Sequence, residues 1–312
     1  MDKDVLLSSS GSELYNNLLH YIRAKTDAVG KGESVSLSDF IDIAQRLIED
    51  VNSSSVLLQT AMGYYDPLDL AISHAANVAI YTLKMATDMG LSERELEDAV
   101  LAALLHDIGI SRLPVYNSNE EDILRFEGTP DQALSVTDRE LVQQHPQFGH
   151  DAIVIDDSRS EYVAEIILQH HEKADGSGYP KGLMEAEQHI PSRIISIIDA
   201  YEALIHPRPL RDAQIPPMGI DALKNQVMGV YSREMLKELI HSFSIYPVGH
   251  FIRLNDGSIG RVIDTHRNNP CRPVIELLFD LKGERIDPPR RLDLKKKQLL
   301  NVLECLPRFR TD

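Results

Sequence analysis

The sequence predicts a mainly α-helical protein with a small helical unit at its N-terminus and a small β module at its C-terminus. Apolar residues recur at helical spacing across most of 66–243, and prolines separate these periodic stretches. After about residue 245 the pattern changes to short alternating runs around an Asn-Asp-Gly turn, which is typical of hairpins. A chain of 312 residues has room for two or three domains. We therefore divide it into 1–64, 65–244 and 245–312.

The first segment, 1–64, is predicted to contain two helices. In 12–28 the large apolar residues fall on one helical face. After a Gly-Lys-Gly turn at 30–32, Ser36 is placed to cap a second helix whose apolar face begins at Leu37. The segment carries no chemical motif, so we expect it to serve as a helical cap or a dimerisation element.

The middle segment, 65–244, is predicted to be a succession of helices. Gly90 is expected to end the first of them. A loop rich in Asn, Glu and Gly is expected over 117–131, and Thr137 is expected to cap the helix that follows it. The predicted helices cover 70–89, 91–107, 139–156, 160–172, 191–205 and 219–243.

The last segment, 245–312, is predicted to be a β module. Its strands are expected at 250–254, 259–264 and 274–279. The Asn-Asp-Gly turn at 255–257 would join the first two as a hairpin. Because this segment has no candidate catalytic cluster, we expect it to support the fold or to bind a partner.

The net charge limits the classes of partner. Lys and Arg number 32 against 48 Asp and Glu, which gives a net charge of −16. Nucleic-acid polymers and anionic membranes select basic surfaces, so we expect neither as a partner, whereas a local cluster or a metal can still attract a small phosphate ligand. Two cysteines in no paired motif exclude a disulfide scaffold. The sequence shows no signal-peptide pattern and no apolar stretch long enough for a bilayer, and we expect a cytoplasmic protein.

Histidines and aspartates lie within or directly after apolar helical stretches of the middle segment, as His106 and Asp107 do after 100–105. Burying such side chains costs several kcal/mol each unless they are paired or bind a metal. A single buried histidine is more often a satisfied core residue, but a set of them on successive helices favours a metal site. The candidate ligands are His74, His106, Asp107, His145, His170, His171 and Asp199.

The types of donor restrict the metal. Imidazole nitrogen and carboxylate oxygen without any thiolate suit iron, manganese or zinc. The candidate ligands are too many for one ion that must also bind a substrate, so we expect two ions bridged by a carboxylate. A two-metal centre suits in-line displacement at phosphorus, because one ion activates a water and both stabilise the charged phosphoryl oxygens.

Two motifs resemble a known family. The pair His106-Asp107 resembles the signature of the HD superfamily of metal-dependent phosphohydrolases. Residues 170–180, HHEKADGSGYP, resemble the HHExxDGxGYP motif of the HD-GYP subfamily, and every fixed position of that motif is filled. The resemblance extends over about 66–243. On these motifs the chain is identified as a member of the HD-GYP family.

The resemblance implies a helical HD bundle with a bi- or trinuclear centre of iron or, alternatively, manganese, which hydrolyses the second messenger cyclic di-GMP to pGpG or GMP. It assigns one ion to His74, His106, Asp107 and Asp199. It has Asp107 bridge to a second ion held by His145, His170 and His171. The pair His106 and Asp107 would thereby carry catalysis, with a metal-activated hydroxide as the nucleophile.

The number of ions follows from one position in the family pattern. Trinuclear members have a Glu four residues before the first histidine of the set, and that position is Leu70 here. The nearby Asp66 and Asp69 lie off that helical register. We therefore expect two divalent ions.

The resemblance also implies contacts with substrate and partner. Gly178 and Tyr179 would lie near the ligand, on a surface that is proposed in the family to meet diguanylate cyclase (GGDEF) domains. The sequence Arg208-Pro209-Leu210-Arg211 resembles the family's RPYR, in which the basic side chains contact the substrate phosphate.

Two departures from the family pattern make this an unorthodox member. Ile110 stands where the family has a Lys after HDxG, and Leu210 stands where it has the Tyr of RPYR. Losing a cation that stabilises phosphoryl charge can cost about 3–4 kcal/mol in the transition state. Phosphodiesterase activity is the expected function. The alternative is a catalytically inactive receptor or scaffold that binds cyclic di-GMP or another nucleotide and GGDEF-type partners. An HD-type di-iron oxygenase is a third class, which oxygen uptake would reveal.

Overall fold

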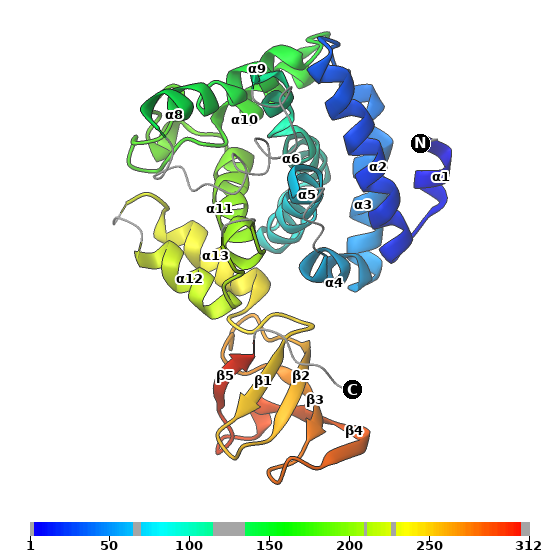
Figure 1. Cartoon of the computed structure of the whole chain (residues 1–312), viewed down its shortest axis with the longest axis vertical. Helices are drawn as coiled ribbons and strands as arrows, with labels where there is room; N and C mark the ends of the chain where they lie inside the picture. Colours follow the sequence, from blue (N-terminus) through cyan, green and yellow to red (C-terminus); the bar gives the residue numbers. More distant parts are fainter. Residues whose placement is uncertain (1–2, 65–69, 115–134, 209–210, 226–228, 307–312) are drawn as a thin grey trace.

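The structure is a computed structural model that describes residues 3–64, 70–114, 135–208, 211–225 and 229–306. A body of helices forms the larger part, and a five-stranded antiparallel sheet forms a β module below it in the view of Figure 1. The mainly α fold with a C-terminal β module is therefore confirmed. None of the helices in these ranges combines the length and apolar character needed to cross a bilayer.

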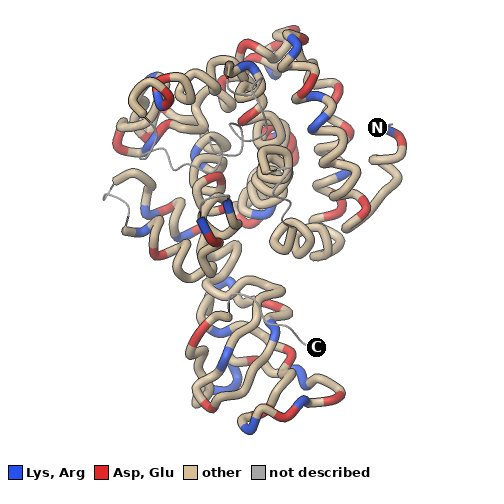
Figure 2. Tube along the Cα trace, in the orientation of Figure 1, with Lys and Arg blue, Asp and Glu red and all other residues tan. Residues whose placement is uncertain are grey.

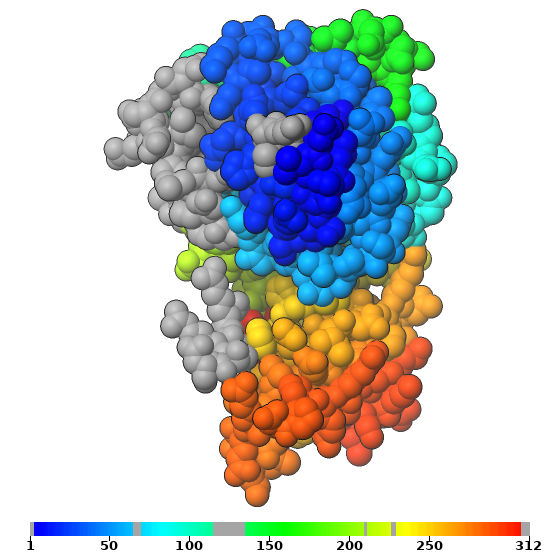
Figure 3. All heavy atoms as spheres, turned by 90° about the vertical axis from the view of Figure 1, so that its right-hand side faces the viewer, coloured from blue at the N-terminus to red at the C-terminus, as the bar shows by residue number. Residues whose placement is uncertain are grey.

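The N-terminal helices pack on the outside of the body, where they form much of its surface, in blue, in the upper half of Figure 3. Two helices were predicted here, and they correspond to α2 and α3, except that Ser36 caps the short turn η1 and α3 begins at Ile41. The additional α1 and α4 escaped prediction because each has only 6 or 8 residues, too few to show a helical period. The elements are α1 (Lys3–Ser8), α2 (Gly11–Gly30), η1 (Leu37–Asp39), α3 (Ile41–Ser53) and α4 (Val56–Gly63).

Two helices of the middle segment, α6 and α10, begin at reciprocal caps. Ser92 accepts a hydrogen bond from the Glu95 backbone while the Glu95 carboxylate accepts from the Ser92 backbone, and Asp157 and Ser160 form the same reciprocal cap. The elements are α5 (Leu70–Met89), α6 (Glu93–Leu105), η2 (Ile108–Arg112), α8 (Val136–Val142), α9 (His145–Ala152), α10 (Ser158–Gln169), η5 (Glu185–Glu187), α11 (Ile190–Ile205), α12 (Pro216–Asn225) and α13 (Arg233–Phe243).

Two long helices predicted from the sequence are each a pair of shorter ones. The stretch 139–156 breaks between α8 and α9, because Pro146 has no N–H to donate to the Val142 carbonyl and suits the first turn of a new helix. The cap of α8 is Ser135 rather than Thr137. The stretch 219–243 is divided into α12 and α13, and Ser232 caps the second of these. The loop expected at 117–131 lies outside the described residues.

Helix α5 runs through the middle of the body. Of its 20 residues 15 are buried, so this helix is covered on nearly every side. The Cα tube of α5 is accordingly almost free of charged residues in Figure 2, whereas the outer helices and the β module carry Lys, Arg, Asp and Glu. Any polar side chain that α5 turns inward must therefore find a partner inside the protein.

One continuous hydrophobic core joins the N-terminal helices to the body. It runs from Leu6 in α1 to Phe243 in α13, whereas a second cluster, from Ile252 to Cys305, lies within the β module. Arg267 of the β module donates hydrogen bonds to the Asp88 carbonyl and to Glu238 of the body. Because they share one core, the N-terminal helices and the body pack as one unit, whereas the β module has a core of its own.

The sheet has the strand order β4-β3-β2-β1-β5 and is antiparallel throughout. The predicted hairpin joins β1 to β2 through the turn at Gly257, whose φ of 92° suits glycine. The strands β4 and β5 escaped prediction. Strand β4 reads RIDPPRRLD, and its prolines and charges are tolerated because it lies at the edge of the sheet. The strands are β1 (Phe251–Leu254), β2 (Ile259–Asp264), β3 (Val274–Phe279), β4 (Arg285–Asp293) and β5 (Val302–Leu306), with the short turn η6 (Leu294–Lys296) before the last.

Candidate metal centre

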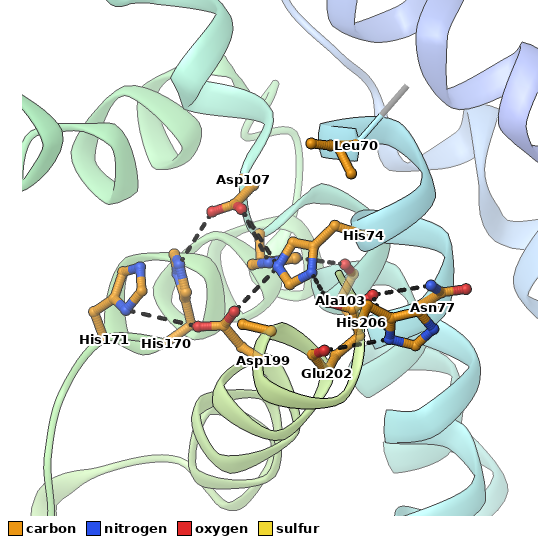
Figure 4. Close-up of polar contacts among 12 residues, drawn as sticks. Leu70, His74, Asn77, Ala103, Asp107, His170, His171, Asp199, Glu202 and His206 are labelled. Atoms are coloured by element: carbon orange, nitrogen blue, oxygen red, sulfur yellow. Dashed lines mark hydrogen bonds and ion pairs between the residues drawn. The ribbon is translucent and has the colours of Figure 1, made fainter. Parts of the chain in front are cut away.

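The seven candidate ligands lie together in the middle of the helical body, although they come from five separate parts of the chain. Figure 4 shows His74, Asp107, His170, His171 and Asp199 pointing toward a common centre. Helix α5 supplies His74, and the end of α6 supplies Asp107. His170 and His171 follow the end of α10, and Asp199 lies in α11. His106 and His145 complete the set at the end of α6 and the start of α9.

Three of the histidines are held by carbonyl groups where helices end. The Nδ1 atoms of His106, His145 and His170 lie 2.8, 2.7 and 2.6 Å from the carbonyl oxygens of the residues three positions earlier. Carbonyls in the last turn of a helix lack backbone partners, so an imidazole N–H can satisfy them. With Nδ1–H donating to a carbonyl, the Nε2 atom keeps its lone pair and faces the centre.

Asp107 lies between two groups of donors. Its Oδ1 is 3.2 Å from His145 Nε2 and 3.6 Å from His170 Nε2. Its Oδ2 is 3.4 Å from His106 Nε2 and 3.8 Å from His74 Nε2. Two sets of side chains have donor atoms close enough together to hold a metal ion, and Asp107 belongs to both. The first set adds His74 and His106, and the second adds His145, His170 and His171.

Asp199 faces the same centre from α11. Its Oδ1 is 3.1 Å from His74 Nε2, and its Oδ2 is 3.9 Å from His171 Nδ1. It therefore spans the two groups on the side opposite Asp107. The side chains of Asp107, Asp199 and His171 are each only 17–19% exposed, which leaves the centre with limited access to solvent.

One buried nitrogen atom, His106 Nε2, indicates that the site binds a cation. The Nε2 of His106 is fully buried, and although Asp107 Oδ2 lies 3.4 Å away it makes no hydrogen bond among the described residues. An uncompensated buried nitrogen costs about 1–3 kcal/mol. A metal ion that accepts this lone pair would remove the cost, so the residues present fit a metal centre of nitrogen and oxygen donors.

The protonation states suit the same interpretation. Burial raises the pKa of Asp107, but the neighbouring His106, His145 and His170 hold it well below the usual value, so the carboxylate is ionised. Burial lowers the pKa of His170 to about 4, and this imidazole is neutral at physiological pH. Metal ligands must carry a free lone pair, which both groups have.

His74 and His106 differ from His170, because burial lowers the pKa of both but a neighbouring carboxylate, Asp107 in the case of His106, raises it above the usual value. Burial lowers the pKa of His74, but the charge of Glu202 and hydrogen bonds to Asp199 and Glu202 raise that pKa to about 10. A proton on His74 Nε2 therefore has to leave before this nitrogen can bind a metal.

Glu202 is a candidate functional residue that was not predicted from the sequence. It is 2% exposed, and its Oε2 lies 2.5 Å from His74 Nδ1 and accepts from Arg208 at 3.1 Å. A carboxylate on the outer nitrogen of a metal-binding histidine fixes its tautomer and raises its basicity. The available signal was spacing, since Glu202 follows Asp199 by three residues and shares its face of α11.

Gly109 brings the chain after Asp107 against α9. A Cβ atom at this position would lie 2.1 Å from the His145 carbonyl oxygen and 2.4 Å from the Gly149 nitrogen. Only glycine permits so close an approach of two backbones. The glycine of the HDIG sequence thereby sets the distance between the ligands on either side of it.

The loop that follows His171 is held from inside by Glu172. This carboxylate is 1% exposed and accepts hydrogen bonds from the backbone nitrogens of Lys181, Gly182 and Leu183 at 2.7, 3.1 and 2.9 Å. Three such bonds to a charged acceptor fix the loop in place.

The predicted substrate residues Gly178 and Tyr179 lie in this loop. A Cβ atom on Gly178 would come within 2.5 Å of the Glu172 Cα and the His171 carbonyl oxygen, so glycine is required here for packing. The ring of Tyr179 stacks on that of His171, with ring centroids 4.8 Å apart. The loop therefore brings an aromatic ring beside a candidate metal ligand.

The two predicted phosphate-binding arginines have different surroundings. Arg208 lies near the centre through its ion pair with Glu202, at 3.1 Å. Arg211 instead donates to the carbonyls of Ala203 and Leu204 in the last turn of α11 and so caps that helix. Leu210, between them in sequence, lies outside the described residues.

Two apolar residues stand where the family pattern has charged ones. Leu70 is the first residue of α5 and is buried, and Figure 4 shows it on the same helix as His74. Ile110 lines a hollow beside Asp107, together with Ile22 of α2. The centre therefore has an apolar wall on this side, and Asp66 and Asp69 lie outside the described residues.

The comparisons with known proteins agree with this geometry. The family model described as "HD domain" matches residues 65–231, more than half of the chain. The chain belongs to the HD domain family. This confirms the family that the HD and GYP motifs predicted. A second model, described as "KOW domain associated with HD domain", matches residues 251–308, which are the β module of this HD domain protein.

Curated relatives of this HD domain protein are phosphodiesterases by name. It is 26% identical over 280 residues to a cyclic di-GMP phosphodiesterase of Pseudomonas aeruginosa, covering 87% of this chain and 64% of the relative. It is 29% identical over 216 residues to the cyclic di-GMP phosphodiesterase PdeB of Borreliella burgdorferi, covering 69% and 54%. It is 29% identical over 188 residues to a 3'3'-cGAMP-specific phosphodiesterase of Vibrio cholerae, covering 60% and 39%. The chain thus spans less than two thirds of the length of these relatives.

Proposed function

We propose that this protein is a metal-dependent phosphodiesterase that hydrolyses cyclic di-GMP to pGpG or GMP. The observation that carries the proposal is the pair of donor sets that share Asp107. Two divalent ions held there would activate water and stabilise the negative charge of the phosphoryl group. The names of the curated relatives support a cyclic dinucleotide as the substrate.

We propose the following roles for the ligands of the two-metal centre. Asp107 bridges the ions, and with His106 it carries catalysis by fixing their separation. The first ion is held by His74, His106, Asp107 and Asp199. The second is held by Asp107, His145, His170 and His171. Iron, with manganese as the alternative, suits these donors, and Leu70 leaves no carboxylate for a third ion at that position.

The substrate contacts proposed here lie around the opening of the centre. The ring of Tyr179, which is stacked on His171, offers a face for a base, while Gly178 lets the loop pass close to that ring. Arg208 has further N–H groups for a phosphate oxygen. Arg211 would join it only by releasing the α11 carbonyls that it now caps.

One observation favours a second candidate function, that of a catalytically inactive receptor or scaffold. Ile110 puts an apolar side chain beside Asp107 where the family pattern has a cation, so one source of charge stabilisation is missing. In that case the centre would bind cyclic di-GMP without cleaving it, and the loop around Tyr179 would meet a GGDEF-type partner.

Replacing Ile110 by lysine tests whether the missing positive charge at this position limits catalysis. We expect Ile110→Lys to raise kcat for cyclic di-GMP about 10–100-fold, because an ammonium near the phosphoryl oxygens stabilises the transition state. The variant Ile110→Met is the matched control, since it changes shape without adding charge. Equal rates for Ile110→Lys, Ile110→Met and the unchanged protein, each loaded with metal, would show that Ile110 is not the deficit. Adding Leu210→Tyr restores the second family side chain and is expected to raise the rate further.

The cellular role of the protein and its division into parts are also proposals. We propose that the protein acts in cyclic-dinucleotide signalling in the cytoplasm, and that 1–64, 65–244 and 245–312 are its three parts. The shared hydrophobic core supports an architectural role for 1–64 toward 65–244.

Steady-state assays with two substrates test the proposed function. Cyclic di-GMP and 3'3'-cGAMP are incubated separately with the metal-loaded protein, and products are separated by chromatography. We expect pGpG or GMP from cyclic di-GMP, and no product from the His145→Ala variant. Tight binding of cyclic di-GMP without any cleavage would favour the receptor, and oxygen uptake would favour an oxygenase.

A further inference from the structure

A chain of buried hydrogen bonds connects the N-terminal helix α2 to the candidate metal ligand His74. The hydroxyl of Tyr15 in α2 donates to Asn77 Oδ1 at 2.7 Å. The amide nitrogen of Asn77 donates to Glu202 Oε1 at 2.9 Å. The other oxygen of Glu202 lies 2.5 Å from His74 Nδ1. Figure 4 shows the last three of these side chains in line.

Every member of this chain is removed from water. Tyr15 is 0%, Asn77 1%, Glu202 2% and His74 6% exposed. In such surroundings each hydrogen bond is stronger than in water, and the loss of one partner leaves the next group unpaired. Asn77 has its oxygen toward Tyr15 and its nitrogen toward Glu202, so the two ends of the amide are fixed by different neighbours.

A second contact reaches the same carboxylate from α4. One ring nitrogen of His206 lies 3.2 Å from Glu202 Oε1, and the other lies 3.2 Å from the Ala61 carbonyl oxygen. Both α2 and α4 are therefore linked to Glu202, one through Asn77 and the other through His206. The N-terminal helices thus reach the side chain that orients His74.

The other half of the centre is built differently. His145 and His170 place their outer nitrogens on carbonyls of Val142 and Ile167, in the turns directly before them. Their orientation depends on the ends of α8 and α10, which the hydrogen bonds of Tyr15 and Asn77 do not reach. The loss of those hydrogen bonds should therefore act on one donor set and spare the other.

We propose that Tyr15 and Asn77 are positioning residues through which the N-terminal helices control the metal affinity of the donor set that contains His74. This inference rests on the metal centre of the proposed function. Asn77 holds the carboxylate of Glu202 in the position that binds His74 Nδ1, and Tyr15 holds Asn77. The N-terminal segment is then part of the metal centre's support, and the hydrogen bonds of Tyr15 and Asn77 act on the affinity of one ion.

The test is a titration of the full chain with Mn²⁺, followed by the electron paramagnetic resonance signal of the free ion. We expect two binding steps, and the step that His74→Ala removes is the one under study. Outer partners of metal-binding histidines contribute about 10–100-fold to affinity, so Asn77→Ala should weaken this step by that factor. Tyr15→Phe should weaken it about 5-fold, the usual effect of one hydrogen bond. The other step should keep its affinity in both variants.

Tyr21→Phe is the matched control for Tyr15→Phe. Tyr21 lies on the same helix and donates to the Asp39 carbonyl at 3.0 Å, away from the centre. Its loss should leave both steps unchanged. The double variant Tyr15→Phe with Asn77→Ala should bind Mn²⁺ as Asn77→Ala alone does, because Tyr15 acts through Asn77.

The inference is overturned if Tyr15→Phe leaves the His74 step unchanged, or if it weakens both steps equally as a general loss of stability would. Additive effects in the double variant would also overturn it. The proposed function can fail separately. A protein that shows two Mn²⁺ steps with the expected response to Tyr15→Phe, yet cleaves no cyclic dinucleotide, would refute the phosphodiesterase and retain the inference.

Discussion

Replacement of Asp107 by alanine is expected to remove both metal ions and to lower the turnover of cyclic di-GMP by more than about 10³-fold. Asp107 is the one side chain common to both donor sets of the described residues. Without it the imidazoles would have only the carboxylate of Asp199 to offset the repulsion between two cations. Both the activation of water and the stabilisation of phosphoryl charge would then be lost. The measurement is the metal content per chain after purification, with the rate determined on the same sample.

Two variants serve as controls for this prediction. Asp199→Ala removes a carboxylate from the set around His74 and should cost mainly one ion. Asp151→Ala removes an aspartate that pairs with His150 on the outer side of α9, and should leave the metal content unchanged. Both ions at full occupancy in Asp107→Ala would show that the bridging role is wrong.

Replacement of Glu172 by alanine is expected to destabilise the protein by about 3 kcal/mol. The buried carboxylate satisfies three backbone N–H groups, and its loss leaves these donors without an acceptor. For a chain of this size the melting temperature should fall by roughly 6–12 °C. Since Tyr179 lies in the released loop, KM for the cyclic dinucleotide should rise as well.

Glu187→Ala provides the comparison for Glu172→Ala. Glu187 accepts a hydrogen bond from the Met184 backbone in the same loop, but this contact is exposed and its loss should cost less than about 1 kcal/mol. Thermal unfolding of the two variants side by side measures the difference. Similar melting temperatures for both would mean that Glu172 does not hold the loop.

The candidate ligands could be predicted from the sequence because their signal is local. Most of the ligands follow or interrupt an apolar helical stretch, as His106 and Asp107 do, so burial of a polar group was evident from the chain alone, whereas the stretch before His145 is polar. Helix α5 covers Leu70–Met89 as predicted, because a long apolar stretch indicates the helix and Gly90 ends it.

The supporting residues could not be predicted because their partners are distant in sequence. Tyr15 and Asn77 are separated by 62 residues, and Asn77 and Glu202 by 125. Nothing near Tyr15 distinguishes it from Tyr21, which is also buried on α2 but faces the Asp39 carbonyl. The division of 139–156 at Pro146 was readable in principle, whereas strand β4 was hidden by its own prolines.

We propose that a two-metal centre that shares Asp107 cleaves a cyclic dinucleotide. The most direct measurement is hydrolysis of cyclic di-GMP by protein purified without oxygen and loaded with iron or manganese, with the metal content of the same sample determined. We predict two ions per chain and the products pGpG or GMP, both lost in Asp107→Ala. Two bound ions with no product would contradict the phosphodiesterase and leave a receptor or scaffold as the function.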